Sequence, residues 1–277
     1  MFNAVMIGEV FADVCKNGAF GEVHSIFERA MNIQISKEDK LLTLVCGDLD
    51  IMATGCVVNA PHGCWRKMAS VGDKMLLTPD VVYIENRPYV GGIASAELWQ
   101  RLSDESISGM DKPAYANLLN ICVDIEGRLD KLDKGLALQA SSLDELDPID
   151  LIGLGDGLTP AGDDFLAGML YALYFFELLY GKCHPGLPKI ADIISQNLNR
   201  TGIISRHFLR YALKGEWGRN TENFLTALVQ GVENDLHNAI DVKLGYGASS
   251  GADELRGCLF GAKEYLKRVG GLYVHNS

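Results

Sequence analysis

The apolar pattern of the 277-residue chain changes its period near residue 95, and this change limits the folds open to it. Before that point, short runs of β-branched and aromatic residues are separated by Gly and Asp, at 40–47, 55–60, 74–78 and 81–86. Such runs are typical of β-strands. After it, apolar residues recur at three- and four-residue spacing, which is typical of amphipathic helices. We therefore expect a strand-rich N-terminal part and a helical C-terminal part.

The Pro and the paired Gly within 87–92 mark the boundary between the two parts, because these residues interrupt regular structure. The expected fold class is α+β. A small antiparallel sheet or barrel would form domain 1–94, and a larger helical bundle would form domain 95–277. No run before the boundary is long enough to predict a helix, although 25–31 could be either a helix or a strand.

Seven C-terminal segments have helical spacing, and glycines follow several of them. They are 113–132, 160–180, 188–200, 202–214, 221–231, 233–240 and 252–268. The most apolar stretch, 165–181, has only 17 residues. A membrane-spanning helix needs about 20 residues. We therefore interpret this stretch as a buried core helix and expect no membrane partner.

The formal charge of −11 comes from 25 basic and 36 acidic residues. Such an acidic chain repels phosphate backbones, so we expect no nucleic-acid partner, although a local pocket for a small anion stays open. The 7 cysteines form no CxxC motif, and the N-terminus lacks the basic start of a signal peptide. Reduced thiols and no leader favour a cytoplasmic protein.

The most informative segment is GLGDGLTPAGDDFLAG at 153–168. Gly153, Gly155 and Gly157 permit a tight turn with positive φ. Thr159 is a good N-cap and Pro160 a good first helical residue. The free N–H groups of that helix start and the helix dipole would then form an anion site.

Asp163 and Asp164 follow one turn into this helix. Their carboxylates stabilise a helix start, and their oxygens could also hold a hard cation such as Mg²⁺. The same turn, cap and acidic first turn are found in any well-capped helix, so a purely structural interpretation also stays open.

A second segment, 251–257, repeats the pattern of the first, because both have glycines six residues apart and an acid two residues after the first glycine. Asp253 aligns with Asp164, whereas Ala252 aligns with Asp163. If the two helix starts face each other, their N–H groups and carboxylates share one polar cleft. A chance match over seven positions is the alternative. A weaker candidate is Ser205-Arg206, where the guanidinium could bind a carboxylate or phosphate.

The blocks 153–168, 201–205 and 245–257 together resemble the family of the AllH-like subunit of oxamate carbamoyltransferase, long known only as a domain of unknown function. This chain has Ala161 where relatives typically carry Ser, and Tyr246 or Gly247 with Ala248 where they often carry a His. The resemblance implies a role in anaerobic purine (allantoin) breakdown, in an enzyme that interconverts oxalurate plus phosphate with oxamate plus carbamoyl phosphate. It also implies other subunits as partners.

Our main hypothesis is a carbamoyltransferase subunit that binds a small anionic substrate, phosphate or carbamoyl phosphate, between the two glycine motifs. Asp164, Asp253 and Asp163 would be catalytic, with Mg²⁺ on Asp163 and Asp164. The remaining candidates would bind substrate, with Arg206 as a carboxylate clamp: Gly153, Gly155, Gly157, Thr159, Gly162, Ser205, Arg206, Ser249, Ser250 and Gly251. The alternatives are a non-catalytic partner subunit whose glycine turns dock a neighbouring chain, and a Mg²⁺-dependent phosphohydrolase.

Overall fold

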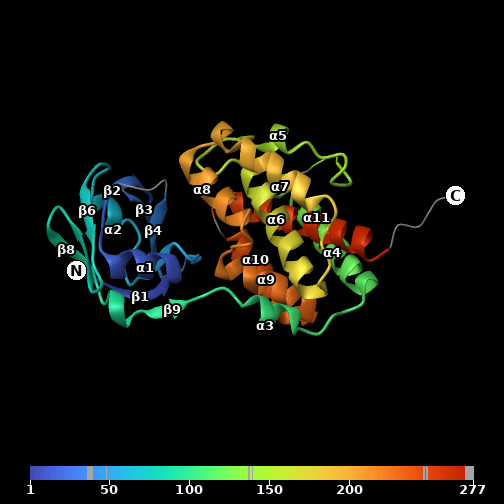
Figure 1. Ribbon diagram of the computed structural model, residues 1–277, viewed down its shortest axis with the longest axis horizontal. Coiled ribbons are helices and arrows are strands. Elements are labelled where there is room, and N and C mark those ends of the chain that lie inside the picture. The colour runs from blue at the N-terminus through green and yellow to red at the C-terminus, as the bar shows by residue number, and fades with distance from the viewer. Residues whose placement is uncertain are drawn as a thin grey trace. The chain divides into compact units, whose positions relative to one another are not determined.

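The computed structural model describes residues 1–35, 40–47, 49–136, 138, 140–245, 247 and 249–271. The chain forms two compact units, Met1–Arg101 and Leu102–Ser277, each with its own hydrophobic core (Figure 1).

The N-terminal unit is built mainly from strands, with short helical segments between some of them. The elements are β1 (Phe2–Gly8), α1 (Glu9–Asn17), β2 (Ala19–Ile26), β3 (Ala30–Ile35), β4 (Leu41–Cys46), β5 (Gly55–Val58), α2 (Cys64–Met68), β6 (Lys74–Leu77), β7 (Val81–Ile84), β8 (Arg87–Gly91), η1 (Ile93–Ser95) and β9 (Glu97–Trp99).

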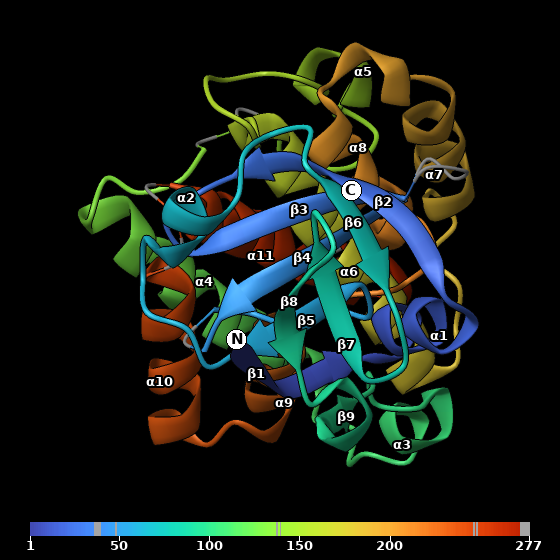
Figure 2. The same cartoon turned by 90° about the vertical axis from the view of Figure 1, so that its left-hand side faces the viewer.

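The strands form one sheet in the order β5-β4-β3-β2-β6-β7-β8-β1-β9, and a further β1–β5 pairing closes the first eight into a barrel (Figure 2). The predicted antiparallel sheet, and with it the fold class as we stated it, is wrong. The β4–β5, β1–β8 and β1–β9 pairs are parallel, so the barrel is mixed. Parallel neighbours are distant in the chain or joined by a crossover, and the alternation within one strand does not reveal them.

The N-terminal unit contains a helix that was not expected, and it decides an alternative that the sequence left open. Helix α1 was not predicted, because its buried face consists only of Phe11 and Cys15, one helical turn apart. The ambiguous segment 25–31 contributes to the ends of β2 and β3 rather than to a helix. Strand β5 is buried on both faces, since Cys56 and Val58 pack in the barrel core and Val57 packs in a separate small cluster. A strand of this kind shows no alternation of polar and apolar residues.

The C-terminal unit is helical in the part of it that the structure describes. Its elements are α3 (Asp104–Ser108), α4 (Tyr115–Lys131), α5 (Pro148–Leu151), α6 (Ala161–Tyr180), α7 (Leu187–Gln196), η2 (Leu198–Arg200), α8 (Ile203–Ala212), α9 (Arg219–Gln230), α10 (Glu233–Leu244) and α11 (Ser250–Val269). All seven predicted helical segments are confirmed. The short helices α3 and α5 were not predicted, although Ser103 and Asp147 cap them through their side chains.

Helix α6 lies at the centre of this unit, as the apolar stretch within it predicted. Most of its residues are buried, including aromatic side chains such as Phe175 and Phe176 that are fully covered. Its main neighbour is α11, which is buried along most of its length. Among the described residues, no helix combines the length and apolar character needed to cross a membrane.

Candidate functional site

Two glycines allow α6 and α11 to touch backbone to backbone. A Cβ atom on Gly168 would lie 2.1 Å from the carbonyl oxygen of Glu254, and one on Gly257 would lie 2.0 Å from that of Phe165. Larger residues cannot fit at such a separation. The two contacts are reciprocal, because Phe165 and Glu254 occupy equivalent positions in the two glycine motifs, as do Gly168 and Gly257. The repeat in the sequence therefore corresponds to a pseudo-symmetric helix pair.

The two helices run in the same direction. Gly257 lies against Phe165, and Gly261, one turn later, lies against Met169. Their N-termini therefore meet at one end, where Thr159 Oγ1 and Ser250 Oγ are hydrogen-bonded at 2.9 Å. The predicted convergence of the two glycine motifs is confirmed.

The glycine turn before α6 has the backbone conformation that its sequence predicted. Gly153, Gly155 and Gly157 have φ of 78°, 110° and 101°, in the region that side chains rarely adopt. The turn folds back, so that the N–H of Gly162 donates to the carbonyl of Leu154 at 2.9 Å. One N–H group of the predicted anion site is thus already bonded inside the loop.

The capping of α6 differs from the prediction in one respect. The cap residue is Pro160, and the first helical residue is Ala161. Thr159 stands one position too early to cap, and its hydroxyl faces Ser250 instead. Helix α11 begins after Ser249, which also makes no side-chain capping bond.

Asp163 is a buried support for this loop. Its Oδ1 accepts a hydrogen bond from the Gly153 N–H at 2.9 Å, and its Oδ2 accepts one from the Thr201 hydroxyl at 2.5 Å. The side chain is 2% exposed. Both oxygens are engaged inside the protein, so the observed geometry gives Asp163 a structural task.

Ser205 and Arg206 lie on α8 and support the same region. The Ser205 hydroxyl donates to the carbonyl of Leu158 at 3.3 Å. The Arg206 guanidinium donates from Nε to the carbonyl of Leu198 and from Nη2 to that of Thr201, both at 3.1 Å. These donors hold backbone carbonyls, so the structure does not aim them at the meeting point of α6 and α11. The predicted carboxylate clamp stays a prediction.

Asp164 and Asp253, the aligned acids, differ from Asp163. Asp253 is 2% exposed, and its Oδ1 accepts from the Leu136 N–H at 2.6 Å. Its Oδ2 is buried and has no hydrogen-bond partner among the described residues, and the same holds for Oδ2 of Asp164. A buried acceptor without a donor is costly and rare, so a pair of them calls for a functional explanation.

The surroundings of both carboxyl groups disfavour their ionised forms. Burial raises the pKa of Asp164 to about 8, although hydrogen bonding to Ser250 partly offsets this, and the negative charge of Glu254 adds to it. Burial also raises the pKa of Asp253, against hydrogen bonds from Ser249 and Leu136. Strongly shifted carboxyl groups of this kind gather at functional sites.

A buried lysine that pairs with Glu254 was missed by the sequence analysis. Lys243 is 2% exposed, and its Nζ donates to Glu254 at 2.7 Å and to the Thr221 hydroxyl at 2.9 Å. It neutralises the acid that follows Asp253 in the chain. It lies at the end of α10, beyond the predicted segment 233–240, and no local pattern marks it.

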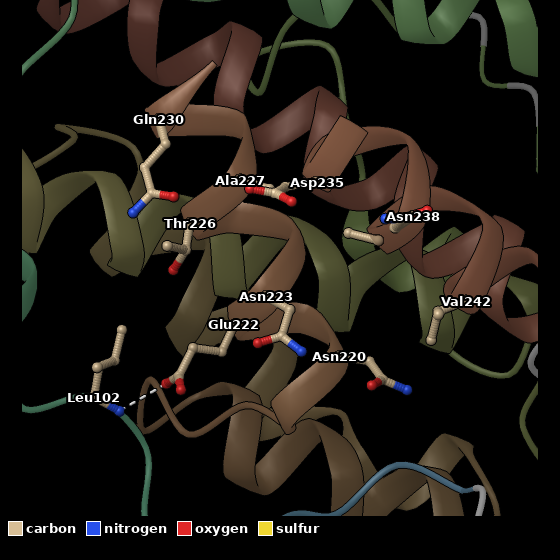
Figure 3. A pocket seen from close by; sticks show the side chains of 11 residues that line it. Leu102, Asn220, Glu222, Asn223, Thr226, Ala227, Gln230, Asp235, Asn238 and Val242 are labelled. Atoms are coloured by element: carbon tan, nitrogen blue, oxygen red, sulfur yellow. Dashed lines mark hydrogen bonds between the residues drawn. The ribbon is translucent and has the colours of Figure 1, made fainter. Parts of the chain in front are cut away.

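A polar pocket between α9 and α10 was also missed. It encloses about 480 Å³ and contains none of the predicted site residues (Figure 3). Its polar side chains are mostly carboxamides, which the sequence analysis did not consider.

The side chains that could bind a metal ion do not gather around Asp163 and Asp164 in the described part of the chain. Among the described residues, no three His, Cys, Asp or Glu side chains lie together as a metal site would require. Mg²⁺ on Asp164 stays a prediction. Tyr246 and Ala248, where relatives often carry a His, lie outside the described residues.

Comparison with known families bears directly on this arrangement. Residues 3–98 match the model of the AllH family N-terminal domain, and residues 151–262 match that of oxamate carbamoyltransferase subunit AllH. The chain belongs to the AllH family. The resemblance inferred from the glycine blocks is thereby confirmed. The AllH match at 151–262 includes both glycine motifs, Lys243 and the pocket residues that α9 and α10 supply. No solved structure matches the chain.

Proposed function

We propose that this AllH-family chain is a subunit of a carbamoyltransferase, that it acts with other subunits of the same enzyme, and that its site lies where α6 and α11 begin. One observation carries the proposal. Asp164 and Asp253 each have a buried carboxyl oxygen without a hydrogen-bond partner in the described part of the chain, and they lie at the start of two parallel helices in contact. The family match supplies the reaction class.

The chemistry of these oxygens suits the carbamoyl group. A carbamoyl –NH₂ has two N–H donors, and a carboxyl oxygen accepts from them whether or not the acid is ionised. Inorganic phosphate at neutral pH offers no N–H group, and ionised carboxylates repel it. Asp164 and Asp253 would therefore hold the amide end of carbamoyl phosphate.

The anionic end needs donors, and the same helix starts supply them. On binding, the hydroxyls of Thr159, Ser249 and Ser250 would turn from their present acceptors to its oxygens. The N–H of Gly251 would add a donor, helped by the positive ends of two aligned helix dipoles. The N–H groups of residues 155–157 in the glycine turn would contribute further donors, whereas that of Gly153 stays bonded to Asp163. Positioning of two reactants, rather than attack by a protein nucleophile, would then lower the barrier.

The substrate pair follows from the family's name and from the resemblance. In the proposed reaction the amide nitrogen of oxamate attacks the carbamoyl carbon, the C–O bond to phosphate breaks, and phosphate leaves while the nitrogen loses one proton. The reverse reaction consumes oxalurate and phosphate. We place it in purine (allantoin) breakdown.

An activity assay of the chain mixed with its partner subunits tests the proposal. Asp164→Leu removes the carboxyl acceptor, and we expect kcat/KM to fall by about 100-fold, as for loss of one transition-state contact. Asp192→Leu is the matched control, because Asp192 is an exposed acid of α7, outside the proposed site, and it should leave the rate unchanged. Full activity of the Asp164→Leu mixture would refute the site and favour the non-catalytic subunit instead.

Magnesium binding is tested separately by thermal unfolding. We expect Mg²⁺ to raise the Tm of the wild-type chain, and Asp164→Asn to weaken this response, because a ligand that binds only the folded state stabilises it. No Mg²⁺ shift with or without phosphate would remove the metal from the proposal and leave its anion-binding part intact.

A further inference from the structure

The polar residues of the α9–α10 pocket are spaced so that they share one face of each helix. Asn220, Asn223 and Gln230 lie on one stripe of α9, at spacings of three and seven residues. Asp235 and Asn238 lie on the facing stripe of α10, three residues apart. Residues at these spacings share a helix face. Two helices thus turn their polar stripes toward one cavity (Figure 3).

The charge of the pocket excludes anions. No Arg, Lys or His occurs among the described residues that line it. Glu222 and Asp235 are acidic, so a phosphate or carboxylate would meet repulsion without a compensating cation. The pocket is therefore not a second copy of the anion site proposed at α6 and α11.

One wall of the pocket is fixed, and one buried hydroxyl in it lacks a partner. The Glu222 carboxylate accepts from the Leu102 N–H at 2.7 Å and from the Trp217 indole at 3.2 Å. Thr226, one turn further along α9, has a buried hydroxyl oxygen without a hydrogen-bond partner among the described residues. Ala227, Ala239 and Val242 add apolar surface. The site thus combines a fixed wall, an apolar side and several hydrogen-bonding groups.

We propose that this pocket binds a small neutral molecule that carries amide or ureido groups. A carboxamide side chain donates and accepts at the same time, so it pairs with another amide through two antiparallel hydrogen bonds. Asn223, Gln230 and Asn238 offer three such groups. Its volume of about 480 Å³ lies within the usual range for small-molecule sites. The proposal is independent of the function proposed for the α6–α11 site.

Binding titrations with the full chain test this proposal. The probe is hydantoin, a neutral cyclic ureide, and the comparison compounds are cyclopentanone, which has a similar ring but no N–H, and succinate, an anion. We expect saturable hydantoin binding in the millimolar range, and much weaker binding of both comparison compounds. Equal binding of cyclopentanone or succinate would refute the assigned ligand class.

Matched variants locate the binding. Asn223→Leu and Asn238→Leu each remove one carboxamide from the pocket, and we expect hydantoin affinity to fall about fivefold, as for one or two lost hydrogen bonds. Asn120→Leu makes the same change at an exposed position of α4, outside the pocket, and should bind as the wild type does. Unchanged Tm values show that the variants are folded. Absence of hydantoin binding to the wild type, or binding that both pocket variants retain, would overturn the proposal.

Discussion

The starts of α6 and α11 share one sequence pattern, yet they use their acidic residues differently. At α6, Asp163 supports the glycine turn. One of its carboxylate oxygens accepts a hydrogen bond from Gly153, and the other accepts one from Thr201. At α11, the equivalent residue is Ala252, which has no carboxyl group. The next residue of each motif, Asp164 or Asp253, has a buried carboxyl oxygen that accepts no hydrogen bond from any residue that the structure describes. The comparison separates an acid that supports the loop from two acids that we propose bind the substrate.

The backbone contact between the helices should produce the largest effect. Gly168→Ala or Gly257→Ala would place a Cβ against a carbonyl oxygen, at 2.1 or 2.0 Å, and force the helices apart. We expect a loss of about 3 kcal/mol or more in the free energy of unfolding, as for severe overpacking. Urea unfolding measures it.

Gly127→Ala is the matched control for these variants. Gly127 lies within α4, and a Cβ there would meet nothing within 4 Å. Alanine should stabilise the chain by about 0.5 kcal/mol, since it restricts the unfolded state. Near-neutral effects at both Gly168 and Gly257 would show that the helices do not touch as described.

Removing the loop acid should have the next largest effect. Asp163→Ala leaves the Gly153 N–H and the Thr201 hydroxyl without their acceptor, and we expect a loss of about 2 to 3 kcal/mol. Asp164→Asn should cost nothing at neutral pH, because the charged form of Asp164 is disfavoured by burial. Denaturant melts of the two variants side by side check the contrast, and equal losses would abolish the distinction between the two acids.

The pH dependence of the free energy of unfolding tests the assigned state of Asp164 further. Burial raises the pKa of Asp164 to about 8 in the folded chain, from its ordinary value of 3.8, so between these values the folded state holds a proton that the unfolded state has released. The contribution of this group to stability is full below about pH 4 and falls as the pH rises toward about 8. Asp164→Asn removes this dependence.

Unfolding free energies of wild type and Asp164→Asn at mildly acidic and mildly basic pH measure the difference. The variant should gain stability relative to the wild type as the pH rises. A constant difference between the two proteins across this range would mean that Asp164 titrates at an ordinary pKa.

Much of this arrangement was predictable from the sequence. Helical spacing and glycines are local signals, and they correctly gave the seven main helices of the C-terminal unit. The alignment of Asp164 with Asp253 also predicted that the two motifs converge. Gly168 and Gly257 are required by the convergence of the two motifs, because the close contact of α6 and α11 leaves no room for a side chain at these positions.

Other features depend on contacts between distant residues, and no local pattern reveals them. Asp163 supports the loop, unlike Asp164, because the path of the chain brings the Gly153 N–H and the Thr201 hydroxyl to its two carboxylate oxygens. Lys243 is buried because Glu254 and Thr221, on two other helices, accept its hydrogen bonds. The parallel strand pairs of the barrel are likewise set by which strands meet, not by their own alternation.

The smallest expected effect lies at the bridge between the motifs. The hydroxyls of Thr159 and Ser250 are 2.9 Å apart, and this hydrogen bond should contribute about 1 kcal/mol. A double-mutant cycle of Thr159→Val and Ser250→Ala measures the coupling energy directly. Additive effects of the two changes would mean that the helix starts do not interact through these groups.

Discrimination between ligands with and without an amide group tests the central claim most directly. Phosphonoacetamide carries a phosphonate and a carboxamide, whereas methylphosphonate has no amide. Against the enzyme assembled with its partner subunits, we predict that phosphonoacetamide inhibits about tenfold more strongly, equivalent to about 1.4 kcal/mol. Asp164→Leu should abolish this preference, and Asp192→Leu should keep it. Equal inhibition by the two compounds, or a preference that survives Asp164→Leu, would contradict the assignment of Asp164 and Asp253 to the carbamoyl group.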